Sequence, residues 1–174
     1  MTGSPDALLR EMLREAELVL AQQLHVLDEV DDKSEQLLTL SVAVAGAGLA
    51  LFAFVADRSR TALPGAFLFA WAGAFIIDLL AAASFLGAYV GVGSGKTRDI
   101  GPHPRWLAQK ANDSTWLEID HLVSLLANYP SYVENNRRIM AASRRATVSG
   151  LVLLFMSVFA YAAAAFYVLR GGIG

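Results

Sequence analysis

Residues 36–56 read QLLTLSVAVAGAGLALFAFVA, an uncharged stretch that lies between Glu35 and Asp57. A helix needs about 20 apolar residues to cross the hydrocarbon core of a bilayer. The stretch is long enough to do so, and it is built mainly from Leu, Val, Ala, Gly and Phe. It therefore predicts a first transmembrane helix over 36–56.

Two further apolar runs complete the pattern. Residues 62–92 contain a single charged residue, Asp78, and residues 146–169 contain none. Strands that face lipid are excluded, because their unpaired backbone groups would find no hydrogen-bond partner there. We therefore expect an all-α integral membrane protein with three transmembrane helices, at 36–56, 62–92 and 146–169.

The composition agrees with a membrane protein. Of the 174 residues, 55% are hydrophobic and 17% are charged, against roughly 25% charged in soluble domains. A chain of this length forms one domain by the usual prior, so residues 1–174 are expected to be a single membrane domain. The absence of cysteine excludes disulfides and thiol catalysis, and a net charge of −2 gives no reason to expect nucleic acid as a partner.

The basic residues predict the orientation in the membrane. Eleven of the 14 Lys and Arg residues lie before the first span or in residues 93–145, and only Arg58, Arg60 and Arg170 lie on the other side. Basic residues are retained on the cytoplasmic face. We expect a multi-pass protein of the cell inner membrane, with a cytoplasmic N-terminus and the C-terminus outside.

The segment before the first span is predicted to be helical. Its apolar positions follow the 4-3 spacing of a coiled-coil seam, at Leu9, Leu13, Ala16, Leu20, Gln23, Leu27 and Val30. No Pro or Gly follows until the span, so a cytoplasmic helix over 5–34, starting at Pro5, should run directly into it. Two interpretations stay open, packing of the seam against the protein's own helices and self-association.

Residues 93–145 are predicted to form a cytoplasmic loop followed by helices. Thr115 and Glu118 have the spacing of a capping box, which indicates the start of a short helix, and Pro130 predicts a break. A second long helix should then run from Pro130 into the third span. We expect the two cytoplasmic extensions to pack as an antiparallel helical stalk.

Asp78 is the candidate for function within the membrane. A carboxylate near the middle of a span costs about 3 kcal/mol on insertion scales. It shares a predicted face with Ala70, Ala74 and Ala81, small residues that let helices approach closely. Asp78 either hydrogen-bonds Ser41 or Thr39 for packing alone, or contributes to an ion or proton pathway or a gating contact.

A second candidate site combines charged residues at the cytoplasmic ends of the spans. Acidic residues before span one should reach the level of basic residues before span three and form salt bridges. The basic stripe, which repeats every seven residues, is explained without a ligand by the retention of basic residues on the cytoplasmic face. The alternative is that it binds anionic lipid headgroups or a phosphate-bearing ligand. The candidates for gating or ligand binding are Asp31, Asp32, Lys33, Arg137, Arg138, Arg144 and Arg145.

Enzymatic chemistry is not expected. Residues 91–97 read GVGSGKT, but a phosphate-binding loop would require glycine where Val90 stands. His25, His103 and His121 lie in separate segments without the spacing of a metal site. We expect no catalytic residue, metal or cofactor.

The entry to span one resembles a known signature. Asp31 to Leu38 reads DDKSEQLL, which is similar to the D-x-K-[AS]-x-x-L-L pattern at the first membrane helix of Pycsar-type and SLATT-like transmembrane effectors, from bacterial antiphage nucleotide-signalling systems. The order of helices and spans is similar too. Residues 136–140 resemble the segment before the last span, although Arg144 or Arg145 stands where a Lys is expected.

The resemblance implies a membrane effector that stays inactive until a cytosolic signal arrives, with a cyclic nucleotide as one candidate, and then permeabilises the inner membrane to stop phage replication. We expect it to assemble as a homo-oligomer through the seam and the small-residue faces. The alternatives are a small ion channel of housekeeping type and a membrane scaffold that does not conduct.

Overall fold

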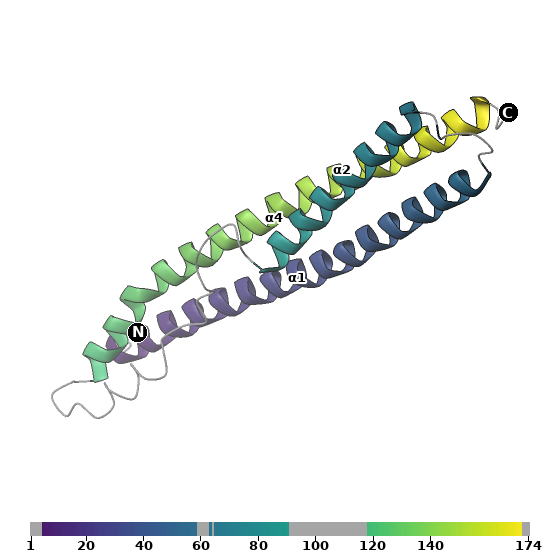
Figure 1. Cartoon of the computed structure of the whole chain (residues 1–174). Coiled ribbons are helices and arrows are strands. Elements are labelled where there is room, and N and C mark those ends of the chain that lie inside the picture. The colour runs from purple at the N-terminus through teal and green to yellow at the C-terminus, as the bar shows by residue number, and fades with distance from the viewer. Residues whose placement is uncertain (1–4, 59–62, 64, 91–117, 172–174) are drawn as a thin grey trace. The chain divides into compact units, whose positions relative to one another are not determined.

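The computed structural model describes residues 5–58, 63, 65–90 and 118–171, and within these ranges it contains three helices and no strand. They are α1 (Pro5–Arg58), α2 (Gly65–Val90) and α4 (Glu118–Gly171) (Figure 1). Each is long and apolar enough to cross a membrane. The predicted class, an all-α membrane protein with three spanning helices, is confirmed.

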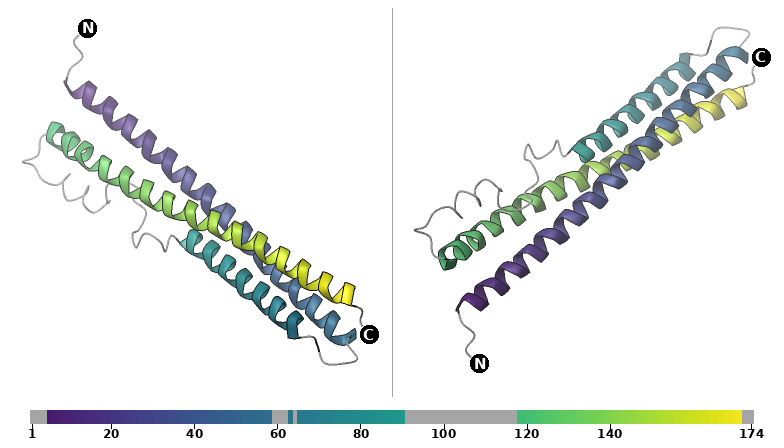
Figure 2. Two further views of the ribbon diagram at one scale, coloured as in Figure 1. Left: turned by 90° about the horizontal axis from the view of Figure 1, so that it is seen from above. Right: turned by 90° about the horizontal axis from the view of Figure 1, so that it is seen from below.

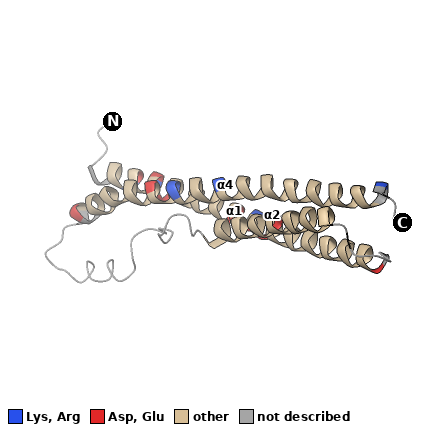
Figure 3. Ribbon diagram, turned by 45° about the horizontal axis from the view of Figure 1, so that its top comes forward, with Lys and Arg blue, Asp and Glu red and all other residues tan. Residues whose placement is uncertain are grey.

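The chain divides into two compact units. We call residues 30–93 with 142–174 the membrane unit, because they contain the three apolar runs. Residues 1–29 with 94–141 are called the extramembrane unit. Figure 3 shows that nearly all of α2 lacks charged residues, and that α4 lacks them along a long stretch that ends at a basic position in its last turn, Arg170.

In the membrane unit the three helices lie side by side (Figure 2). Helices α1 and α4 are parallel, because Ser34 contacts Thr147 and Gly48 contacts Tyr161, both 113 positions apart. Helix α2 is antiparallel to α1. Ser41 contacts Asp78, and Gly48, seven residues later on α1, contacts Trp71, which is seven residues earlier on α2.

Each helix of the membrane unit buries a stripe of positions seven residues apart, the period of a left-handed coiled coil. Most of these positions hold small residues, which lets backbones approach where lipid supplies no hydrophobic drive between helices. The buried stripes are Ser34, Ser41, Gly48 and Val55 on α1, Phe67, Ala74, Ala81 and Ala88 on α2, and Ser143, Gly150, Ser157 and Ala164 on α4. Helices α2 and α4 bury a second set at the same spacing, Asp78 and Phe85 on α2 and Leu154 and Tyr161 on α4.

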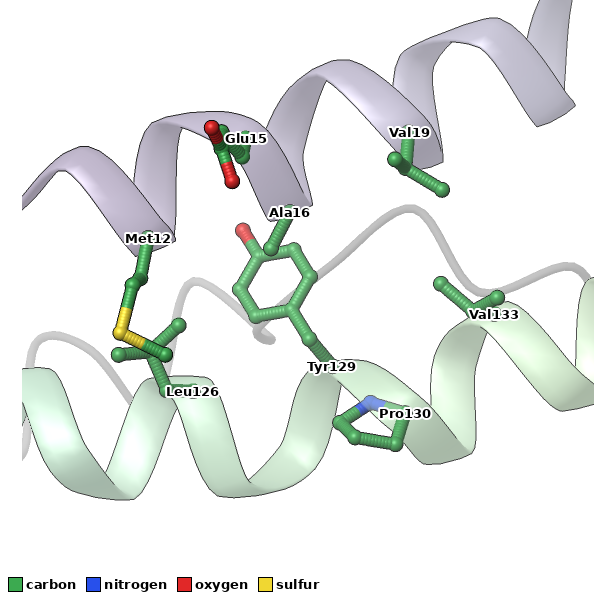
Figure 4. Close-up of a pocket in the computed structure, with 8 residues that line it drawn as sticks. All are labelled: Met12, Glu15, Ala16, Val19, Leu126, Tyr129, Pro130 and Val133. Atoms are coloured by element: carbon green, nitrogen blue, oxygen red, sulfur yellow. The ribbon is translucent and has the colours of Figure 1, made fainter. Parts of the chain in front are cut away.

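The extramembrane unit buries larger side chains at the same spacing, since water drives apolar burial there. Helix α1 buries Leu20 and Leu27, and α4 buries Leu122, Leu125, Tyr129, Asn136 and Ile139. The seam predicted from Leu9 to Val30 is therefore occupied within the chain itself, at least at Leu20 and Leu27. Met12 lies beside Leu126 and Val19 beside Val133 (Figure 4), so the two helices are parallel and the predicted antiparallel arrangement is wrong.

Helix α4 continues through Pro130, so the predicted break is also wrong. Proline removes one backbone N–H, so the carbonyl of Leu126 loses its helical donor. Side chains next to Pro130 donate to two other carbonyl groups of the helix. The Asn128 amide donates to the carbonyl of Ser124 at 2.8 Å, and the Ser131 hydroxyl donates to that of Asn128 at 2.7 Å. The buried Tyr129 adds packing that overrides the local preference. Thr115, the other half of the predicted capping box, lies outside the described residues.

Candidate functional site: a polar layer inside the membrane unit

Asp78 lies in the interior of the membrane unit with 1% of its surface exposed. The Ser41 hydroxyl of α1 lies 2.8 Å from Asp78 Oδ1, to which it donates, and 3.3 Å from the Asp78 carbonyl oxygen. The second carboxyl oxygen, Oδ2, is buried and has no hydrogen-bond partner among the described residues. Asp78 thus faces the bundle, as predicted, with one oxygen satisfied and one not.

The predicted face around Asp78 is only partly correct. Ala74 and Ala81 are buried with it, but Ala70 is exposed and Trp71 is half-buried in its place. The seven-residue period explains the difference, because a step of seven back from Asp78 leads to Trp71. Ser41 is the partner. Thr39 is exposed and donates to the carbonyl of Glu35 in its own helix, at 3.0 Å.

Tyr161 is the α4 residue that lies near Asp78, and it was not identified from the sequence. Its ring lies against Gly48 so closely that a Cβ added there would be 2.5 Å from Tyr161 Cζ. The hydroxyl is buried, has no hydrogen-bond partner in the described part of the chain, and lies within electrostatic range of Asp78. A frame with alternating steps of four and three on span three, laid through Gly150, Leu154 and Ser157, would have indicated its inward position.

Two further contacts tie α1 to its neighbours. Trp71 Nε1 donates to the carbonyl of Gly48 at 2.9 Å. The hydroxyls of Ser34 and Thr147 lie 3.1 Å apart, and each also lies within 2.9 Å of a carbonyl in its own helix. Two protons serve these three contacts, so the Ser34–Thr147 bond competes with the bonds to the backbone.

The charged candidates lie mostly at the surface. Asp31 is half-buried and Asp32 and Lys33 are exposed, as are Arg137, Arg138, Arg144 and Arg145. Arg138 pairs with Glu134 of its own helix at 2.9 Å. The coupling of acidic and basic stripes stays a prediction. Among the described residues there is no cluster of side chains suited to a metal ion.

The extramembrane unit has an open apolar cleft of about 400 Å³ between α1 and α4. Figure 4 shows Tyr129 of α4 pointing across it toward α1. Burial raises the pKa of the Tyr129 hydroxyl, and the negative charge of Glu17 and the neighbouring Tyr132 raise it further. The phenol is therefore neutral at physiological pH, and the cleft offers an apolar surface with one polar end.

Comparisons with protein family models, with curated proteins and with solved structures find no match. The fold and the polar layer define the class: a multi-pass, all-α membrane protein that keeps a carboxyl group in the interior of its bundle.

Proposed function

We propose that this protein is a non-enzymatic membrane effector that changes the permeability of the bilayer when a cytosolic signal arrives. The observation that carries the proposal is the burial of Asp78 between apolar helices whose spans contain no basic residue. A charged side chain at this depth is costly and is by default a hypothesis of function. One hydroxyl donor compensates only part of that cost.

The assignment to antiphage defence rests on the resemblance at Asp31 to Leu38. Ser34 of this signature is fully buried and contacts Thr147. Leu37 and Leu38 pack on the cluster of Ala81, Phe85 and Leu154. These inward contacts of Ser34, Leu37 and Leu38 support a role of the signature in holding α1 against the other spans, while Asp32 and Lys33 point outward.

The same proposal includes the partners. Arg144 and Arg145 are exposed beside the start of the third uncharged run, where basic side chains attract anionic lipids or a phosphate-bearing signal such as a cyclic nucleotide. Homo-oligomerisation would use outward faces, because Leu20 and Leu27 of the seam are buried within one chain.

A non-conducting scaffold is the second candidate, and the dense packing inside the bundle favours it. Phe67 and Phe85 have no exposed surface. A pathway through this interior therefore requires a rearrangement, whereas a scaffold requires none. A housekeeping channel would need the same rearrangement as the effector. The two differ only in the signal that opens the pathway.

Asp78→Asn tests the proposal. High expression raises the number of open copies even when each copy opens rarely without the signal, so overexpressed wild type is expected to lower the membrane potential and arrest growth, read by a potential-sensitive dye and by colony counts. Asp78→Asn keeps the volume but cannot ionise, so it should abolish both effects at an unchanged membrane level. The control is Asp57→Asn at an exposed position near the end of α1. A wild type that leaves the membrane potential intact at high expression would support the scaffold.

The orientation gives a separate prediction. The chain has no cysteine, so single cysteines report their own position. Arg170→Cys should react with a membrane-impermeant maleimide in intact cells, and Ala127→Cys only after permeabilisation, because of the distribution of basic residues. Both positions are exposed. Labelling of Ala127→Cys in intact cells would reverse the orientation.

A further inference from the structure

The polar residues of the membrane unit are separated along the bundle. Ser34 with Thr147, Ser41 with Asp78, and Gly48 with Tyr161 succeed one another at seven-residue steps of α1. Seven residues of helix span about 10 Å. This distance is too long for a direct hydrogen bond between successive levels, so the levels do not form one connected network.

Apolar clusters lie on both sides of Asp78. Toward the C-terminal end of α2, Ala81 and Phe85 pack with Leu154. Toward its N-terminal end, Phe67 packs with Val55 and Ala164. Phe67, Phe85 and Ala81 have no exposed surface. Interiors of this kind are packed as densely as organic crystals, with few voids larger than a water molecule, which disfavours a hydrated metal ion.

We infer that the species this bundle moves is the proton, and that Asp78 is its binding site. The inference rests on the proposed function, because it specifies what permeates. Asp78 Oδ2 and the Tyr161 hydroxyl are buried oxygens without a hydrogen-bond partner in the described residues, on two helices and within electrostatic range. A carboxylate that takes a proton on Oδ2 becomes a carboxylic acid, and it returns to the carboxylate when a water molecule removes that proton.

The side chains around Asp78 suit a proton better than a metal ion. The Ser41 hydroxyl, which lies 2.8 Å from Asp78 Oδ1, can both donate and accept a hydrogen bond, so it fits either protonation state of the carboxyl group. An alkali cation would need several oxygen ligands in place of its hydration shell. Asp78 is the only carboxylate in the three apolar runs 36–56, 62–92 and 146–169.

The structure represents a closed state of this pathway. The two clusters lie between Asp78 and the two ends of the membrane unit, so a proton reaches Asp78 only when water passes Phe85 or Phe67. Replacing these rings with alanine leaves cavities in both clusters. Phe67→Ala with Phe85→Ala should therefore open the pathway without the unidentified signal.

The experiment uses the full chain in vesicles that contain a pH-sensitive dye. Proton flux is measured with valinomycin to compensate charge, and K⁺ flux is measured in parallel with a protonophore. The double variant should raise proton flux by about tenfold or more, the change that ~1.4 kcal/mol of barrier produces, with no matching rise for K⁺. Adding Asp78→Asn should return proton flux to the level of the wild type.

The control removes two phenylalanine rings that lie on the outside of the bundle. Phe69 and Phe159 are 82% and 73% exposed, so Phe69→Ala with Phe159→Ala should leave both fluxes unchanged. If Phe67→Ala with Phe85→Ala loses the circular dichroism signal of its helices, the milder double variant Phe67→Leu with Phe85→Leu is measured in its place.

Three results would overturn the inference. If K⁺ flux rises together with proton flux, the proposed permeability function stands and proton selectivity fails. If proton flux persists after Asp78→Asn, Asp78 is not the binding site. If a folded interior variant conducts neither ion, both the inference and the proposed function fail.

Discussion

Gly48→Ala is expected to destabilise the membrane unit. A Cβ at this position would lie 2.5 Å from Cζ and 2.8 Å from the hydroxyl oxygen of Tyr161. The Tyr161 side chain is buried and packed against α1, so relief requires the helices to separate. Overpacking of this kind costs roughly 1–3 kcal/mol. The midpoint of thermal unfolding in detergent should therefore fall.

Gly46→Ala is the matched control, because nothing lies within 4 Å of a Cβ at Gly46. Alanine favours a helix over glycine by about 1 kcal/mol, so this variant should unfold at the same or a higher temperature. Tyr161→Leu should recover part of the loss in Gly48→Ala, since it removes the ring that the methyl group meets. Equal midpoints for Gly46→Ala and Gly48→Ala would show that α1 and α4 are not in close contact at this level.

Hydropathy and charge were sufficient to predict the helices and the spans. A helix that crosses lipid must satisfy its backbone internally and present apolar side chains, and both requirements are visible in residues 36–56. The seam predicted from Leu9 to Val30 continues in the structure along α1, where Ser34, Ser41 and Gly48 are buried at steps of seven residues.

The errors have physical causes. Pro130 was expected to end a helix on local preference, but tertiary packing around Tyr129 keeps the helix continuous. Ala70 was placed beside Asp78 because steps of four were followed on α2. A supercoiled bundle repeats every 3.5 residues, which brings Trp71 inward instead. Tyr161 was missed because its contact with Gly48 depends on how α1 and α4 are aligned.

The alignment of helices is the part that a single sequence does not contain. Ser41 and Asp78 were paired correctly because both are polar residues in apolar surroundings, where each needs a partner. Gly48 and Tyr161 give no such indication. The contact between two polar residues that need a hydrogen-bond partner was predictable from the sequence. The contact that depends on the steric fit of a ring against a glycine required the structure.

Leu27→Asp is expected to have the largest effect on the extramembrane unit. Leu27 has no exposed surface, and burying an unpaired carboxylate there costs several kcal/mol. Most single substitutions cost about 0.5–3 kcal/mol, so the cost of this one is unusually large. We expect it to separate α1 from α4 in this unit. Limited proteolysis should then cut α1 and the first part of α4 rapidly. Leu18→Asp on the same helix is the control, because Leu18 is 62% exposed.

The same variant decides between the two interpretations of the seam. If Leu27 packs within one chain, Leu27→Asp increases proteolysis and lowers helical content, and the mass measured by light scattering need not change. If the seam joined separate copies, the mass would fall while each chain stayed protected. The contacts of Ser41 with Asp78 and of Gly48 with Tyr161 lie in the membrane unit, so the three spans should remain inserted. Protection equal to that of Leu18→Asp would contradict the internal packing of Leu27.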